Sequence, residues 1–306
     1  MRPVTSISIW GAQAQRFCEC RASARVVAVF ARSFHLEADG DFVCIGDASI
    51  GRGPLNAIVE LAGWAWAARH LPAVGAEACI GEGTMQCGRV ALVTAAACSW
   101  LPPPWPHNAE REALIAALED LERLACGEAP VDGIARVALM DPACVPASGL
   151  ARVARPRIAR LREWLGVRLA RPMREPAPLD LVGLGSGLTP SGDDLLCGAL
   201  VALHAIGQVD AAHDLYAAIS KAARLATSPL SAAFLRAAAE GQSSEPLHET
   251  IIALLENQNV AHPLEAVARI GHTSGWDALA GAVLVLRAFA SLTGQGCPVA
   301  RRSVSL

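Results

Sequence analysis

The 306-residue sequence contains a single lysine, Lys221, and its cysteines do not have the spacing of metal ligands. Its ten cysteines form no Cys-x-x-Cys pair and no cysteine–histidine ligand pattern, which argues against the common zinc sites. Several of them lie within apolar runs, as reduced cysteines of the cytoplasm do. No stretch reaches the roughly 20 apolar residues that a membrane-spanning helix needs. We therefore expect a cytoplasmic protein without a metal site and without a membrane partner.

Standard nucleotide-binding and hydrolase motifs are missing as well. The glycines at 183, 185 and 187 do not have the G-x-G-x-x-G spacing, and neither a P-loop lysine nor a G-x-S-x-G elbow is present. The formal net charge of −3 gives no electrostatic reason to expect nucleic acid. The arginine-rich run 152–174 reads as a helix with a solvated basic face. We expect no nucleic-acid partner and no cofactor.

The composition that remains, 53% hydrophobic and 18% charged, is that of a globular protein with a large core. Residues 1–105 carry strand signals at 25–34, 42–45, 84–87 and 89–94, with a turn at Asp39-Gly40. Between them, 57–68 looks helical, with Asn56 as its N-cap. The proline break 100–106 suits a domain boundary. The expected fold class is α+β, with a β-rich domain over 1–105 and a mostly helical domain over 106–306.

The helical part is predicted from apolar periodicity and short polar links. Proline-rich residues 171–178 form a second linker within it. The expected helices cover Glu110–Cys126, Ala147–Leu165, Leu195–Ile206, Ala211–Ala226, Pro229–Glu240, Pro246–Gln258, Leu264–Ile270 and Gly275–Leu292.

The chain is organised around a glycine-rich loop that opens into an apolar helix, GLGSGLTPSGDDLLCGALVAL over 183–203. Ser191 suits an N-cap, and Asp194 three residues later completes a capping box. The helix that follows is apolar on nearly every side, which predicts burial. A buried helix that opens from a glycine loop presents free N–H groups and the positive end of its dipole.

The same pattern occurs twice at a constant offset, 274 − 191 = 83. SGWDALAGAVLVL over 274–286 repeats SGDDLLCGALVAL over 191–203, with Gly281 in the place of Gly198. A glycine inside a helix costs about 1 kcal/mol relative to alanine. Its double use at one position predicts a pseudo-symmetric pair of closely packed helices whose N-termini face one shared pocket.

Three polar corners place hydroxyl and N–H groups at helix starts, which suits a small carboxylate or phosphate. They cover 185–194, 226–231 and 271–277. A further glycine corner holds Gly53 and Asn56, which also read simply as a turn and a helix cap. The candidate substrate-binding residues are Gly185, Gly187, Thr189, Ser191, Gly192, Ser228, Thr273, Ser274, Gly275, Asp277, Gly53 and Asn56.

Asp193, Asp194 and His272 are the candidate catalytic residues. Asp194 and Asp277 are also explained as capping-box carboxylates, whereas Asp193 lies in the first helical turn with no capping role. His272 stands beside a helix start, where an imidazole could transfer protons. The three aspartates leave open a metal-dependent hydrolase, although no surrounding pattern of oxygen ligands accompanies them.

The segment GSGLTPSGDDLLCG over 185–198 resembles the signature G-x-G-L-T-P-x-G-D-D-x-x-x-G of a bacterial family that includes the AllH-type subunit of oxamate carbamoyltransferase. Supporting stretches are 53–56, 228–241 and 271–281, so the resemblance runs from about residue 25 to residue 292. Ser186 stands where many relatives are expected to have proline. The resemblance implies a part in moving a carbamoyl group between carbamoyl phosphate and oxamate, with partner subunits, in anaerobic allantoin and purine breakdown.

The resemblance and the polar corners together predict an enzyme subunit that handles a small carboxylate or carbamoyl substrate. Thr189, Ser191, Thr273 and Ser274, together with loop N–H groups, would bind the anionic end. Fixed N–H donors would stabilise the oxyanion of acyl-type transfer. The alternative is a non-catalytic assembly or small-anion-binding subunit, in which the glycine corners only cap closely packed helices.

Overall fold

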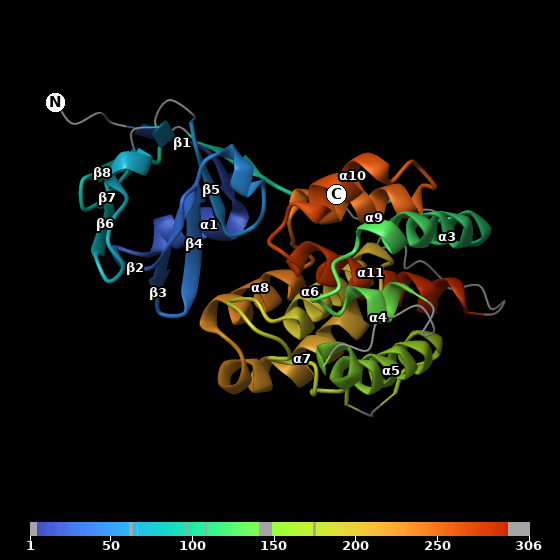
Figure 1. Cartoon of the computed structure of the whole chain (residues 1–306). Coiled ribbons are helices and arrows are strands. Elements are labelled where there is room, and N and C mark those ends of the chain that lie inside the picture. The colour runs from blue at the N-terminus through green and yellow to red at the C-terminus, as the bar shows by residue number, and fades with distance from the viewer. Residues whose placement is uncertain are drawn as a thin grey trace, which may run out of the picture. The chain divides into compact units, whose positions relative to one another are not determined.

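The computed structural model describes residues 5–60, 64–65, 67–95, 97–107, 109–140, 149–173 and 176–292. The chain divides into two compact units, one formed by Met1–Pro103 with Gln242–Glu245 and the other by Pro104–Gly241 with Pro246–Leu306. Each unit has its own hydrophobic core. The first is β-rich and the second is helical (Figure 1), which confirms the predicted α+β fold class. None of the described helices is long and apolar enough to span a membrane.

The first unit is built on one sheet that closes on itself. Its strand order is β5-β4-β3-β2-β6-β7-β8-β1-β9, and β1 also pairs with β5, so the first eight strands form a closed ring. Closure leaves few unpaired strand edges. The strands are β1 (Thr5–Gly11), β2 (Ser23–Val29), β3 (Ser33–Ala38), β4 (Asp41–Gly46), β5 (Asn56–Val59), β6 (Glu77–Gly81), β7 (Thr84–Cys87), β8 (Val90–Val93) and β9 (Cys98–Trp100).

Helix α1 (Ala12–Cys20) follows β1 directly and buries Ala14 and Phe17 in the core of this unit. Its entry requires a glycine, because a Cβ at Gly11 would lie 1.9 Å from the carbonyl oxygen of Gly53. The Pro54 carbonyl then accepts from the first N–H groups of the helix, at 3.0 and 2.9 Å. The Gly53-Pro54 corner is therefore a part of the fold that holds the start of α1.

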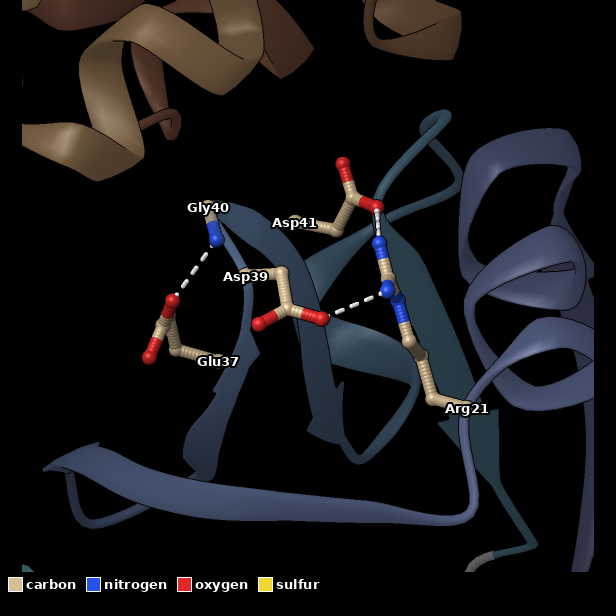
Figure 2. Close-up of polar contacts among 5 residues, drawn as sticks. All are labelled: Arg21, Glu37, Asp39, Gly40 and Asp41. Atoms are coloured by element: carbon tan, nitrogen blue, oxygen red, sulfur yellow. Dashed lines mark hydrogen bonds and ion pairs between the residues drawn. The ribbon is translucent and has the colours of Figure 1, made fainter.

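The predicted turn at Asp39-Gly40 joins β3 to β4, and both residues have positive φ, 51° and 81°. The turn is tied to the end of α1 by Arg21, which donates to Asp39 at 2.7 Å and to Asp41 at 2.6 Å (Figure 2). The Gly40 N–H donates to Glu37 at 2.8 Å on the other side of the turn (Figure 2). The guanidinium thus fixes the loop relative to the helix.

Two predictions in this unit are wrong. The stretch 25–34 is two strands, because β2 ends at Val29 and β3 begins at Ser33. Asn56 starts strand β5 instead of capping a helix, and its side chain donates to the carbonyl groups of Ile50 and Gly51 at 3.1 and 2.9 Å. The run 57–59 is buried in the sheet, where strand pairing with β1 and β4 overrides the predicted helix. Later in the predicted helix 57–68, residues 64, 65 and 67 are helical, and residues 61–63 and 66 lie outside the described part of the chain.

The second unit contains the predicted helices with small shifts of their ends, although residues 147–148 lie outside the described part of the chain. A short helix, Ala135–Leu139, is the one that the sequence analysis missed there. The helices are α3 (Arg111–Glu128), α4 (Ala135–Leu139), α5 (Gly149–Ala170), α6 (Ser191–Ala205), α7 (Val209–Ala226), α8 (Pro229–Ala239), α9 (Glu245–Leu255), α10 (Ala261–Ala268) and α11 (Ser274–Ala290).

Helices α6 and α11 run through the middle of this unit (Figure 1). Every residue of α6 except His204 is buried, as its uninterrupted apolar sequence predicts. The two helices pack mainly against each other, α6 also against α8 and α11 also against α4. They form the core of the unit and place their N-terminal residues at its candidate site.

Candidate functional site

The repeated glycines bring the two central helices into backbone contact. A Cβ at Gly198 would lie 1.7 Å from the carbonyl oxygen of Ala278, and one at Gly281 would lie 1.8 Å from that of Leu195. The two contacts are equivalent, because 278 − 195 = 83 and 281 − 198 = 83. The prediction of a closely packed, pseudo-symmetric pair is therefore confirmed by these reciprocal contacts.

The structural repeat extends further back than the sequence repeat. Gly192 donates its N–H to the Leu184 carbonyl at 2.8 Å, and Gly275 donates to Ile270 at 3.0 Å. Here the offset is 270 − 184 = 86, three more than the 83 of the helices, so the loop before the helix is three residues longer in the first copy. The extra residues lie within Gly185–Pro190, the glycine-rich loop.

The capping boxes predicted inside each helix are not formed. Pro190 and Thr273 are the N-cap residues, and neither makes a side-chain cap hydrogen bond. The carboxyl groups act across the pair instead: Ser274 lowers the pKa of Asp194, and Ser191 lowers that of Asp277, in each case against the larger effect of burial. A capping pattern is local in sequence, whereas here the symmetric partner helix supplies the hydroxyl.

Asp193 is fully buried, and three donors use both of its oxygens. Oδ1 accepts from the Gly183 N–H at 2.8 Å. Oδ2 accepts from the Ser231 hydroxyl at 2.8 Å and from the Thr227 hydroxyl. The side chain therefore ties the start of α6 to the glycine loop and to the start of α8, a structural role that the sequence did not reveal.

Asp277 has an equally defined structural contact. Its Oδ1 accepts from the backbone N–H groups of Ile134 and Ala135, both at 2.8 Å, and so holds the start of α4. A Cβ at Gly133 would lie 2.8 Å from this oxygen, so the approach needs glycine. The sequence analysis missed Gly133 and Ile134, although the Asp-Gly pair at 132–133 is a turn signal that could have marked them.

Asp194 occupies the position equivalent to Asp277 but caps no neighbouring helix. The residue is 9% exposed, and its Oδ2, like Oδ2 of Asp277, has no hydrogen-bond partner among the described residues. Burial raises the pKa of this carboxyl well above its usual range, and Asp277 and Asp193 raise it further by charge repulsion. Asp194 is therefore a buried acid with an unused oxygen at the junction of both helix ends.

The three polar corners meet through side-chain contacts. The Thr189 and Ser274 hydroxyls lie 3.0 Å apart, which joins the first corner to the third. Ser228 donates to the Leu188 carbonyl and also caps α8, where it accepts from the Ser231 N–H at 3.0 Å. The first corner thus lies between the other two, and Gly192 and Gly275 belong to one cluster.

The outer part of this cluster is open to solvent. Loop residues 185–188 and His272 are exposed, whereas Thr189, Thr273 and Ser274 are half-buried. His272 Nε2 lies 3.1 Å from a carboxylate oxygen of Asp132, also exposed. Gly185 and Gly187 have φ of 116° and 95°, a backbone conformation that favours glycine. The half-buried hydroxyl groups of Thr189 and Ser274 contact the buried Asp194, and the loop residues 185–188 and His272 nearby in the sequence are exposed.

The expectation of free backbone N–H groups at the helix starts is largely wrong. In α6, Gly192 donates to Leu184, and Asp193 and Asp194 both donate to the Pro190 carbonyl at 2.9 and 3.1 Å. In α11, Gly275 and Asp277 likewise donate to protein carbonyls. The turns before the helices bring the Leu184 and Ile270 carbonyls onto the two glycine N–H groups, and the aspartate N–H groups bond to the N-cap carbonyls as in any first helical turn.

Gly53 and Asn56 belong to the first compact unit, whereas the residues of this cluster belong to the second. Their contacts are those of the corner before β5, described above. Within the described residues, no group of three or more His, Cys, Asp or Glu side chains is arranged to hold a metal, so Asp193, Asp194 and Asp277 do not form the three-carboxylate site of the hydrolase alternative.

Two cavities are described in the chain, and neither is lined by a residue of the cluster. These two cavities are therefore not the shared pocket that the sequence predicted, and that pocket stays a prediction.

A comparison with known proteins finds a family match over the part of the chain that contains this cluster. No solved structure matches the chain. Residues 181–286, which begin just before the glycine-rich loop and end within α11, match a family model described as oxamate carbamoyltransferase subunit AllH. This segment contains both copies of the repeat and the start of α8. The resemblance expected from the GLTPSGDD segment is therefore confirmed, and the core of the helical unit is similar to the AllH subunit family of oxamate carbamoyltransferases.

Proposed function

We propose that this protein is a subunit of a carbamoyltransferase that transfers the carbamoyl group between carbamoyl phosphate and a small carboxylate-bearing amide such as oxamate, in the recovery of nitrogen from allantoin. The match over residues 181–286 supports the reaction class. The family description names a subunit, so the proposal includes partner subunits. Their contribution to the site is part of the same proposal.

The observation that carries a catalytic role is the unused Oδ2 of Asp194, in a carboxyl that, unlike Asp277, holds no backbone N–H group of a described neighbouring helix; Oδ2 of Asp277 is unpartnered as well. A buried polar atom without a partner is rare in folded proteins and calls for an explanation. A substrate amide N–H would satisfy it. The half-buried Thr189 and Ser274 hydroxyls, 3.0 Å apart, lie between the exposed loop and this carboxyl, where they can bind the carboxylate or carbamoyl oxygens of a substrate.

In the proposed reaction the substrate nitrogen forms a bond to the carbamoyl carbon, and the bond from that carbon to the phosphate oxygen breaks. The nitrogen loses one proton, which the Asp194 carboxylate accepts directly or through the Ser274 hydroxyl. The phosphate takes the electron pair of the broken bond and leaves. A carboxyl with a raised pKa suits this role, because a base works best when its pKa lies near the operating pH.

Asp193 and Asp277 have positioning roles in this proposal. Asp193 holds the glycine loop and α8 against α6, and Asp277 holds α4 against α11. Both keep the hydroxyl groups of Thr189 and Ser274 in place. His272 lies at the exposed edge beside Asp132, where it can meet a substrate anion at the entrance.

The test is carbamoyl transfer from carbamoyl phosphate to oxamate, measured as phosphate release with the full-length chain alone and with its partner subunits. Asp194→Asn is expected to lower the rate at least about a hundredfold, the usual contribution of a general base. Asp210→Asn, which changes an exposed aspartate of α7, is the matched control and should leave the rate unchanged. Full activity of the Asp194→Asn complex would contradict the catalytic proposal.

A second candidate function is an assembly subunit without catalytic residues. One observation favours it: both oxygens of Asp193 are used within the fold. In that case the Asp194→Asn complex would keep its activity, and omission of this chain would prevent the partner subunits from assembling. Sedimentation of the partners with and without the chain separates the two candidates.

A further inference from the structure

A cavity of about 640 Å³ lies among α3, α4, α5 and α11 in the helical unit. None of the candidate residues discussed above lines it. Its wall combines two arginines and one glutamate with aliphatic side chains, among them Leu284 and Leu292. Cavities of 300–1,000 Å³ are in the size range of sites for small molecules.

Arg287 forms the inner side of this cavity. Its guanidinium donates to the Ala138 carbonyl at 2.5 Å and to the Leu139 carbonyl at 3.0 Å, and it pairs with Glu122. These bonds cap the C-terminal end of α4 and fix the guanidinium in one orientation. Burial lowers the pKa of Arg287. The negative charge of Glu122 raises this pKa, and the positive charge of Arg162 lowers it. A guanidinium has five N–H donors, so donors remain for a ligand.

Arg162, on α5, forms the outer side and is exposed. It makes no hydrogen bond and no ion pair with any residue that the structure describes, although other arginines of α5 do: Arg157 donates to the Asp180 carbonyl and Arg168 pairs with Asp214. Among the described residues that line the cavity, two arginines accompany one acidic side chain, which gives these residues a net charge of +1.

We propose that this cavity binds a small monocarboxylate, whose carboxylate lies between Arg162 and Arg287 and whose aliphatic part packs against Leu284 and Leu292. The charge balance favours a monoanion over a phosphate dianion. The planar guanidinium groups match the two oxygens of a carboxylate. Gly166 leaves room in the wall, since a Cβ built there would meet no atom within 4 Å.

The experiment is isothermal titration of the full-length protein with butyrate, hexanoate and inorganic phosphate. Saturable binding of a carboxylate to the unaltered protein is expected, with phosphate binding at least tenfold more weakly. Arg162→Gln should weaken carboxylate binding at least tenfold, and Gly166→Leu, which fills the cavity, should abolish it. Arg152→Gln, an exposed arginine of the same helix outside the cavity, should bind as the unaltered protein does.

The thermal midpoint of each variant reports whether it is folded, so a loss of binding in a folded variant can be assigned to the cavity. The proposal is overturned if neither carboxylate binds saturably, if Arg162→Gln and Gly166→Leu bind as well as the unaltered protein, or if phosphate binds as tightly as hexanoate. None of these readouts depends on carbamoyl transfer.

Discussion

The two copies of the repeat share one backbone plan but use their carboxyl groups differently. Both have a glycine pressed against the other helix and an aspartate that faces the serine of the other copy. In the second copy Asp277 holds the start of α4 through two backbone N–H groups. In the first copy its equivalent, Asp194, has no such contact and lies beneath a loop that is three residues longer.

This difference indicates how a symmetric scaffold can support an asymmetric site. In the first copy, Asp193 holds the start of α6 to Gly183 and to the start of α8. The equivalent position in the second copy is a tryptophan, Trp276. Asp194, by contrast, bonds the Ser274 and Thr189 hydroxyls and no backbone N–H group of a described neighbouring helix. A buried carboxyl with a raised pKa is a candidate for function.

The largest effect is expected from the glycines that make the helix pair possible. Gly198→Val and Gly281→Val each place side-chain atoms against a backbone carbonyl, which forces the helices apart and should lower the free energy of unfolding by about 3 kcal/mol or more. Urea denaturation measures this. Gly166→Ala, where the Cβ meets nothing, is the control and should be neutral or stabilising. A tolerated valine at either position would contradict the reciprocal contact.

A smaller effect should separate the two equivalent aspartates. Asp277→Ala leaves the N–H groups of Ile134 and Ala135 without an acceptor, at a cost of about 2–3 kcal/mol in the free energy of unfolding. Asp194→Ala removes a carboxyl that makes no such bond, so its cost should stay below about 1 kcal/mol. Chemical denaturation of both variants checks this, and equal losses would show that the two copies are structurally equivalent after all.

The dependence of stability on pH should sharpen the same comparison. Burial raises the pKa of Asp194 and Asp277 in the folded protein, so between the ordinary carboxyl pKa and the raised one the folded state holds a proton that the unfolded state has released. The free energy of unfolding therefore falls as pH rises through this window, by at most about 1.4 kcal/mol per pH unit for each group.

Asp194→Asn should flatten this slope, since Asp194 has the more strongly raised pKa and no backbone donors to offset it. Thermal unfolding at a series of pH values above 4 measures the slope. If the slope is unchanged in Asp194→Asn, its carboxyl has an ordinary pKa in the folded protein, and the proposed base loses its basis.

The smallest effect is expected at the start of α8. Ser228 caps this helix and donates to the glycine loop at Leu188. Ser228→Ala should cost about 1 kcal/mol, the usual value for the loss of a cap. Ser220→Ala, which changes a half-buried serine within α7, is the matched control. A loss no larger than that of the control would show that this corner does not depend on the cap.

Much of the helical unit could be predicted because its signals are local. Apolar periodicity places α3 and α5 to α11 within a few residues, and the repeated glycine predicts the close pair. The short helix α4 was missed because five residues carry too little periodicity. In the β-rich unit, Asn56 misled the prediction, because an N-cap and the start of a strand can use the same residue types.

The sequence by itself determined that two similar apolar helices exist and that each begins at a serine, a glycine and an aspartate. It could not determine the partners of those aspartates. Only the tertiary structure decided that Asp193 binds Gly183, Thr227 and Ser231, and that Asp277 holds α4. Hydrogen bonds of a buried carboxyl depend on which distant backbone and hydroxyl groups the packing brings within about 3 Å, and no local pattern encodes that distance.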